Sequence, residues 1–281
     1  MKNKFLYISL ALILAEPVNL TINSKNSKAH IANKNCFLND KQNFIDSFLN
    51  RRNYEKIFPE YSHATSFIKL KNAEFNKIKN TAENKKNMML SIIFPELIRY
   101  SLFRDFFETK SLELGYVEYE SKLVDFSIGR FQMKPSFVKK LEEYVKDSEN
   151  LAKKYSRVTT YRDITIKGIR KERIERLNSF NWQFIYLNCF YDVLSEKFKD
   201  VEWQNNVEKL KFYATAYNHN FCASKQEIDK WINVRTFPYG VNYKGEQYSY
   251  SDIAVYFYQN HLLKNKHCEN QIINKNPILN K

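Results

Sequence analysis

The stretch from Met88 to Phe107 constrains the fold of this chain most strongly, because it is too rich in apolar residues for a surface helix. Such a segment has to lie at the centre of the protein, where other elements cover it on all sides. Glycine and proline are scarce, with 5 and 6 among 281 residues, which disfavours a loop-rich all-β fold. We therefore expect a mainly α protein built around this segment.

The formal net charge of +14 suggests attraction to a polyanion such as nucleic acid, anionic lipid or a cell-wall polymer. A second explanation is equally open, because the chain is crowded with Lys, Asn and Ile, the amino acids of AT-rich codons. Charge alone therefore selects no partner.

The N-terminus has the pattern of a secretory signal peptide. Lys2 and Lys4 precede the apolar run Phe5–Ala15, and polar sequence starts at Glu16. Eleven apolar residues are too few to span a bilayer comfortably, and a buried N-terminal helix is the other interpretation. We expect residues 1–15 to be removed on export, so that the mature protein is periplasmic or secreted and meets the membrane only through its signal.

Hydrophobic periodicity and capping residues divide the rest of the chain. We expect a polar linker over 16–38, an N-terminal helical extension over 39–85, a main helical domain over 86–265 and a flexible tail over 266–281. Residues 156–168 predict a loop or short hairpin, and residues 239–249 a turn region. Helices are predicted from residue 40 onward and at 64–80, 136–144, 169–198, 205–219, 224–234 and 252–263.

Export would place the four cysteines, Cys36, Cys189, Cys222 and Cys268, in a compartment that permits disulfides. Four cysteines allow three pairings, and the sequence does not choose between them. A Cys189–Cys222 bridge would join two predicted helices, but independent thiols are equally compatible. No CxxC or Cys/His spacing indicates a metal site, and we expect no cofactor.

Glu96 lies inside the apolar segment Leu90–Tyr100. Burial raises the pKa of a carboxyl group, and a carboxyl protonated near neutral pH is what a general acid for glycosidic bond cleavage needs. The alternative is that Pro95 opens a new helix whose N-terminal dipole is complemented by Glu96. The dipole would lower the pKa and oppose the catalytic interpretation.

A second segment, Phe126–Pro135, combines features of a ligand-binding wall. Gly129 permits close approach of a ligand or of another backbone. Gln132 offers a donor and an acceptor in one amide, suited to a sugar hydroxyl or N-acetyl group, while Phe131 and Met133 supply apolar surface. An ordinary glycine-containing loop before a helix is the competing interpretation.

A third segment, Phe212–Phe221, ends a predicted helix at Tyr217 and Asn218. These two side chains can hydrogen-bond a carboxyl group or a substrate, although an asparagine here is also a common helix stop. Singly, this segment is ambiguous.

Together and in this order, the three segments resemble the motifs of the lysozyme-like lytic transglycosylases, with patterns such as "AII..ES.F", "GLMQ..P.TA" and "A.AYNAG". The matching stretches are Leu90–Glu96, Gly129–Pro135 and Ala214–Asn218, and the resemblance covers about residues 87–234. It implies a lysozyme-like helical domain with a small hairpin or loop region. It also implies Glu96 as the catalytic residue and a substrate-binding set of Gly129, Phe131, Gln132, Met133, Tyr217 and Asn218.

The chain departs from the family pattern at several positions. Leu97 replaces the serine after the catalytic Glu, and the glycine of the third motif is lost because His219 and Asn220 follow Asn218. Residues 102–125 resemble an insertion that offers rival acids, of which Glu108 is the main one and Glu113, Glu118 and Glu120 are the others.

In this family one Glu acts as acid and then as base on the bond between N-acetylmuramic acid and N-acetylglucosamine, and gives a 1,6-anhydro product. By resemblance, Gln132 would hold the substrate, while Tyr217 and Asn218 would orient Glu96. Hydrolysis as in goose-type lysozyme stays open, as does an envelope protein that binds peptidoglycan without cutting it. A nucleic-acid-binding helical protein is a distant rival, which the export signal disfavours.

The expected partner is therefore the peptidoglycan glycan strand, with no nucleic acid and no cofactor or metal. Free peptide carboxylates make such strands anionic, so a basic surface would recruit them. One candidate is the cluster of Arg170, Lys171, Arg173 and Arg176, for which a solvated basic face is the simpler interpretation.

Overall fold

The computed structural model describes residues 52–76, 82–103, 116–118 and 126–263. They belong to the compact unit Leu49–Lys281. The predicted signal peptide, linker, helix from residue 40 and tail, together with Cys36, Cys268 and Glu108, lie outside these residues. In the described part, no helix combines the length and apolar character that a membrane span needs.

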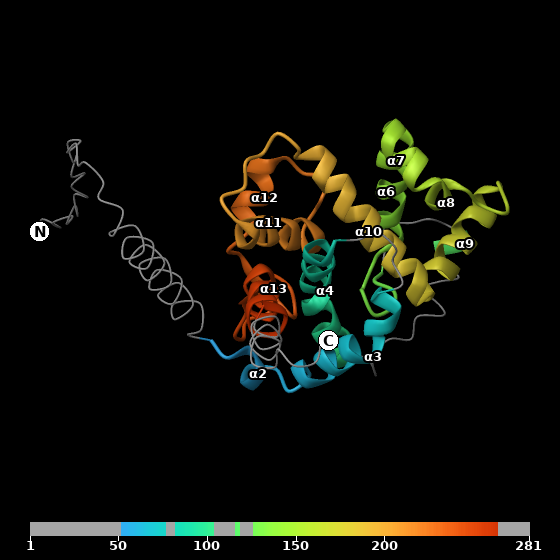
Figure 1. Cartoon of the computed structure of the whole chain (residues 1–281). Helices are drawn as coiled ribbons and strands as arrows, with labels where there is room; N and C mark the ends of the chain where they lie inside the picture. Colours follow the sequence, from blue (N-terminus) through green and yellow to red (C-terminus); the bar gives the residue numbers. More distant parts are fainter. Residues whose placement is uncertain (1–51, 77–81, 104–115, 119–125, 264–281) are drawn as a thin grey trace, which may run out of the picture. The chain divides into compact units, whose positions relative to one another are not determined.

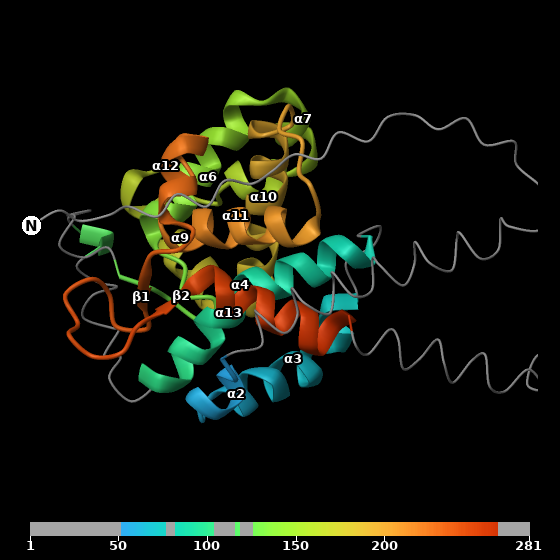
Figure 2. The same ribbon diagram turned by 90° about the vertical axis from the view of Figure 1, so that its left-hand side faces the viewer.

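The described residues are mainly helical, which confirms the prediction of a mainly α protein (Figure 1). The helices are α2 (Tyr54–Ile57), α3 (Tyr61–Asn76), α4 (Glu83–Phe103), α6 (Pro135–Asp147), α7 (Glu149–Lys154), α8 (Ser156–Thr159), α9 (Ile166–Asn178), α10 (Phe180–Lys197), α11 (Asn206–Asn218), α12 (Lys225–Trp231), α13 (Tyr250–Phe257) and the π-helix η3 (Tyr258–Leu263). Strands β1 (Arg235–Phe237) and β2 (Tyr248–Ser249) pair antiparallel beside α13 (Figure 2).

Helix α4 is the central element that the apolar stretch predicts. It packs against α3, α10, α11 and α13, and every residue from Asn87 to Ile98 is buried. The helix continues through Pro95, so the interpretation that Pro95 opens a new helix is wrong. Proline removes an N–H from the helical ladder without ending the helix here. In the same part of α4, the Ile92 carbonyl accepts a hydrogen bond from the Tyr250 hydroxyl of α13 at 2.9 Å.

Two predictions of secondary structure are wrong. The helix predicted over 169–198 is two helices, α9 and α10, because Ser179 is extended (φ −89°, ψ 122°) and separates them. Serine competes for backbone hydrogen bonds and favours such boundaries. Residues 156–159 form helix α8, whereas residues 160–165 form the predicted loop and not a hairpin. The strand pair lies instead on either side of residues 238–247.

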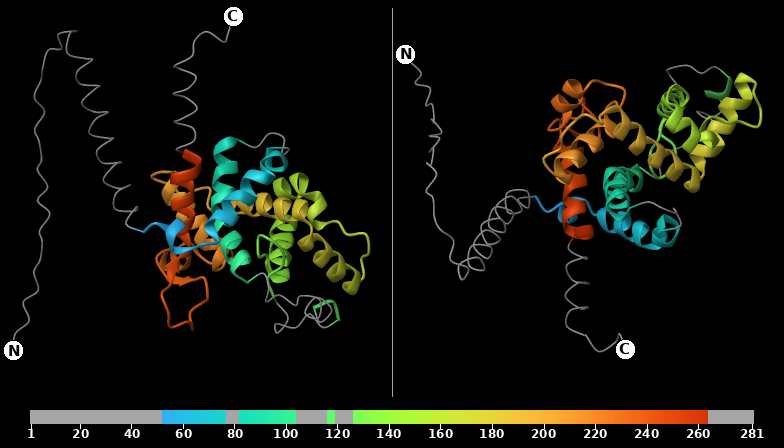
Figure 3. Two further views of the ribbon diagram at one scale, coloured as in Figure 1. Left: turned by 90° about the horizontal axis from the view of Figure 1, so that it is seen from below. Right: turned by 45° about the horizontal axis from the view of Figure 1, so that its top comes forward.

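Other boundaries agree with the sequence. Asn205 caps α11 by accepting hydrogen bonds from two backbone N–H groups, and Ser224 caps α12 by accepting one from Glu227. Helix α6 begins at Pro135, one residue before the predicted start at residue 136, because the fixed φ of proline suits the first helical position. Helix α10 then contacts both α6 and α9 (Figure 3).

Cys189 is buried in α10, and Cys222 is partly buried beyond α11. Both are free thiols, so the bridge between them does not occur. Burial raises the pKa of the Cys189 thiol to about 12, which leaves it protonated and unreactive near neutral pH.

Candidate active site

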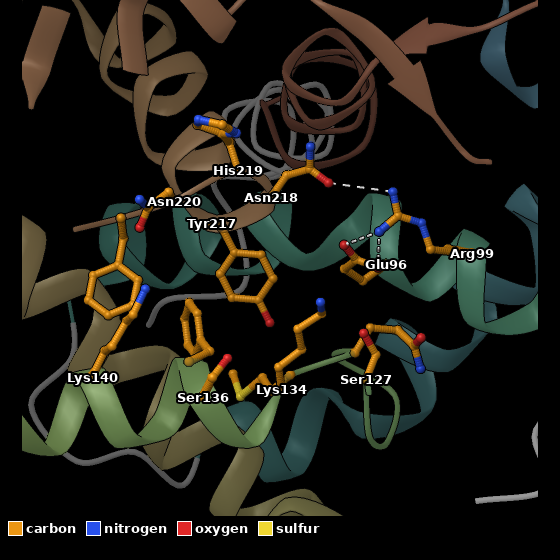
Figure 4. Close-up of a pocket in the computed structure, with 14 residues that line it drawn as sticks. Glu96, Arg99, Ser127, Lys134, Ser136, Lys140, Tyr217, Asn218, His219 and Asn220 are labelled. Carbon is orange, nitrogen blue, oxygen red and sulfur yellow. Dashed lines mark hydrogen bonds and ion pairs between the residues drawn. The ribbon is translucent and has the colours of Figure 1, made fainter. Parts of the chain in front are cut away.

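A cavity of about 280 Å³ lies where α4, the turn before α6, α6 itself and the end of α11 meet (Figure 4). All three segments singled out in the sequence contribute to its wall. The lining residues are Glu96, Arg99, Ser127, Gln132, Met133, Lys134, Ser136, Phe137, Lys140, Tyr217, Asn218, His219, Asn220 and Phe221. Five of the seven predicted site residues are among them.

Glu96 is the carboxyl group of this wall and is only 3% exposed. Burial raises its pKa, while the neighbouring Arg99 guanidinium and the nearby Tyr250 hydroxyl act in the opposite direction. The carboxyl group is therefore held between burial, which favours its protonated form, and neighbours that favour its ionised form.

Arg99 is the principal residue that the sequence interpretation missed. Its Nη1 donates to both carboxyl oxygens of Glu96, at 2.7 Å and 2.9 Å. Its Nη2 donates to Asn218 Oδ1 at 3.4 Å, and its guanidinium carbon lies 4.9 Å from the centre of the Phe237 ring. The i,i+3 spacing of Glu96 and Arg99 on one helix was the signal that could have revealed this pair.

The opening of α6 is shaped by a tight turn. Ile128 and Met133 exchange backbone hydrogen bonds at 2.9 Å and 3.2 Å, so that the chain reverses over four residues. Gly129 (φ 69°) and Gln132 (φ 50°) both adopt left-handed backbone conformations in this turn. The Gln132 amide donates to the Gly129 carbonyl at 2.8 Å, which stabilises the turn and keeps the side chain at the cavity wall.

Gly129 lies behind the cavity rather than in its lining. A Cβ atom at Gly129 would lie 1.8 Å from Nε2 of Gln183 on α10. The Gln183 amide fills that space, donating to the Leu177 carbonyl at 2.7 Å and accepting from the Phe131 N–H at 2.9 Å. The close approach expected of Gly129 is therefore made by another part of the protein and not by a ligand.

Phe131 also differs from the prediction that it contacts substrate. Its side chain is fully buried and packs edge-on against Phe180 and Phe184. Only its backbone reaches the site region, because the Tyr217 hydroxyl donates to the Phe131 carbonyl at 2.7 Å.

That hydrogen bond also corrects the role expected of Tyr217. Its hydroxyl joins α11 to the tight turn and does not orient Glu96, although the ring lines the cavity. Burial and the nearby Glu96 raise the pKa of Tyr217 well above its ordinary value, so it remains a neutral donor. Asn218 acts on Glu96 indirectly, through Arg99.

Cations outnumber anions around the cavity. Arg99, Lys134 and Lys140 line it together with the carboxyl of Glu96. Lys134 lies close enough to favour the ionised form of Glu96. Lys140 lies on the first turns of α6, one turn after Ser136 and Phe137, so helical spacing after Pro135 could have revealed it.

The other charged candidates lie elsewhere. Glu118 forms an ion pair with Lys167 on the protein surface, and Glu108, Glu113 and Glu120 fall outside the described residues. Of the predicted basic cluster, Arg173 and Arg176 are buried, whereas Lys171 is exposed and Arg170 is partly exposed. Arg173 pairs with Glu142 and Arg176 with Glu172.

Comparison with known proteins gives no relative: no protein-family model, curated protein or solved structure matches the chain significantly. Within the residues that the structure describes, no group of three or more His, Cys, Asp or Glu side chains is arranged to hold a metal ion. The function of the protein therefore has to be inferred from the motifs and from the geometry of the cavity.

Proposed function

We propose that this protein is an exported lytic transglycosylase that cleaves peptidoglycan, with Glu96 as its acid and base. One observation carries the proposal: the buried Glu96 carboxyl opens into a cavity whose other walls hold Gln132, Tyr217 and Asn218. These are residues of the three motifs that resemble the lysozyme-like lytic transglycosylases, brought together from positions up to 122 residues apart in the chain.

The chemistry needs one carboxyl group that changes its role. Protonated Glu96 gives its proton to the glycosidic oxygen as the bond from C1 of N-acetylmuramic acid to that oxygen breaks. The resulting carboxylate then accepts the proton of the C6 hydroxyl while O6 bonds to C1, which forms the 1,6-anhydro sugar and restores the acid. Glu96 is the one carboxyl among the described lining residues, which fits this scheme rather than a pair of carboxylates.

The test is the release of soluble fragments from purified peptidoglycan, with the products identified by mass spectrometry. Glu96→Gln keeps the size of the side chain and removes its acid, so cleavage should fall by about 10²- to 10⁴-fold. Glu118→Gln is the matched control, because it removes a surface carboxyl and should leave cleavage unchanged. Reducing ends in place of 1,6-anhydro ends would identify a lysozyme.

A second candidate is a protein that binds the same glycan without cutting it. The favouring observation is that Arg99 hydrogen-bonds both oxygens of Glu96, which opposes proton donation. Under this candidate, the wild type and Glu96→Gln would both co-sediment with insoluble peptidoglycan, and neither would release fragments. Fractionation of the producing cells would test the export that both candidates require.

A further inference from the structure

The ion pair between Glu96 and Arg99 has an unusual geometry. A single nitrogen, Nη1, serves both carboxyl oxygens, so the pair lacks the two parallel hydrogen bonds of a bidentate arginine–carboxylate contact. Nη2 makes only a long bond of 3.4 Å to Asn218, and the buried Nε has no hydrogen-bond partner among the described residues. Arg99 therefore retains hydrogen-bonding capacity that Glu96 does not use.

The surroundings of this pair favour an incoming anion. Lys134 and Lys140 face the same cavity as Arg99, and 22% of the Arg99 side chain is exposed. The first turn of α6, with Ser136 and Phe137, also lines the cavity, and the N-terminus of a helix carries partial positive charge. An anion that enters meets three cations and one carboxyl that is already paired.

We propose that Arg99 is a releasable clamp on Glu96, and that a carboxylate carried by the bound sugar takes over Arg99 and frees Glu96 to act as the acid. This inference rests on the proposed function, because it assigns the trigger to the substrate of that site. Arg99 is a positioning residue in this scheme, since it acts through Glu96 and through the substrate's charge. The lactyl carboxylate of N-acetylmuramic acid, which is free on glycan strands that carry no stem peptide, is a group of the required kind.

The other groups around Glu96 do not supply this switch. Tyr217 on α11 and Tyr250 on α13 are buried phenols whose pKa values lie well above the ordinary value, so they stay neutral. Lys134 precedes α6 and lines the cavity. His219 is stacked on Trp231, 4.0 Å between ring centres, with its Nε2 3.5 Å from Glu227, and therefore faces α12. Arg99 contacts Glu96 directly with a full charge.

The experiment is an NMR titration of the full chain with glutamate labelled with ¹³C at its side-chain carboxyl, in which Glu96→Gln identifies the Glu96 signal by its loss. N-acetylmuramic acid and N-acetylglucosamine are the paired probes, because they differ by the lactyl carboxylate. The acidic sugar should raise the pKa of Glu96 by about one unit or more, since an opposite charge nearby lowers a carboxyl pKa by about 1 to 3 units. The neutral sugar should leave it unchanged.

Arg99→Gln should show the raised pKa without any sugar and no further response to the acidic one. If Arg99→Gln fails to fold, Arg99→Lys is the substitute, because it keeps the positive charge. The comparison of the two sugars uses the wild type and needs no variant. Equal effects of the two sugars, or no effect of N-acetylmuramic acid, would overturn the clamp. The titration needs no turnover, so cleavage without a pKa response defeats the clamp alone, and a response without cleavage defeats the proposed enzyme alone.

Discussion

Among the described residues, two arginine–glutamate pairs have an almost fully buried glutamate and differ in how completely they are hydrogen-bonded. Glu96 and Arg99 lie one turn apart on α4 and line the candidate site. Glu142 and Arg173 lie 31 residues apart and join α6 to α9. Both carboxyl groups are almost fully buried, at 4% and 5% exposed, so burial alone does not distinguish them.

The second pair is a closed network. Arg173 Nε and Nη2 each bind a separate oxygen of Glu142, at 3.1 Å and 2.7 Å, in the fork-to-fork geometry that Arg99 lacks. Arg173 Nη1 donates to the Tyr116 hydroxyl at 2.7 Å, and the Tyr161 hydroxyl donates to Glu142. A cavity of about 240 Å³ borders this network as well, so the difference lies in its hydrogen bonds and not in access to space.

The contrast shows how an ion pair that stabilises the fold differs from one that can exchange its partner. Arginine cannot lose its charge in a protein, so a buried arginine has to keep its partner unless water can reach it. Arg173 is 6% exposed and Arg99 is 22% exposed. The pair of Glu142 and Arg173 therefore maintains the fold, and the pair of Glu96 and Arg99 can be rearranged at a small cost in stability.

The largest expected effect comes from removing the charge of Glu142. Glu142→Gln leaves Arg173 buried and without a counter-charge, and we expect a loss of about 3 to 5 kcal/mol in the free energy of unfolding. Glu96→Gln is the matched variant and should lose less than about 1 kcal/mol, because Arg99 can turn towards the cavity. Urea unfolding followed by circular dichroism measures both. Equal losses would erase the distinction between the two pairs.

A second test asks whether the tight turn before α6, which lies behind the cavity, is as rigid as the network of Glu142. Gly129→Ala places a methyl group against Gln183 in a left-handed backbone conformation, so we expect a loss of about 3 kcal/mol. Gly240→Ala is the control, because Gly240 also has a positive φ (88°) but has no atom within 4 Å of its added methyl. Its loss should be about 1 kcal/mol. If both variants lose the same free energy of unfolding, Gln183 can move aside and the turn is not rigid.

The sequence predicted the buried position of Glu96 but not the pairing of Glu142 with Arg173. The density of apolar residues around Glu96 predicts α4 as a central helix, because burial on every face leaves a composition without a polar stripe. The three motif segments indicated which parts of the chain meet at the cavity. Pairing between Glu142 and Arg173 depends on how α6 and α9 cross, which local periodicity does not encode.

The same limit applies to individual roles within the site. Tyr217 lines the cavity as predicted, but its hydroxyl binds the Phe131 carbonyl, a contact between segments 86 residues apart. The sequence does not reveal the break at Ser179, which separates α9 from α10, because helical spacing of apolar residues continues across it, from Ile174 and Leu177 to Phe180 and Phe184. Sequence patterns thus identified which residues gather, whereas tertiary packing decides which atoms they use.

The smallest expected effect is a pH dependence that belongs to Glu96. Burial raises the pKa of Glu96 above its ordinary value of 4.5, so the folded protein holds this proton more tightly than the unfolded chain. The corresponding stabilisation is complete below the ordinary value and is lost as pH rises through the folded pKa. Glu96→Gln has no proton to lose and lacks this decline.

The free energy of unfolding of the wild type, minus that of Glu96→Gln, should therefore decrease as pH rises from about 4 towards neutrality. Each unit by which the folded pKa exceeds the unfolded one contributes about 1.4 kcal/mol to the decrease. Urea unfolding at a series of pH values measures the difference. Two parallel curves would mean that Arg99 fully offsets the burial of Glu96, and that this pair is as firmly locked as the pair between Glu142 and Arg173.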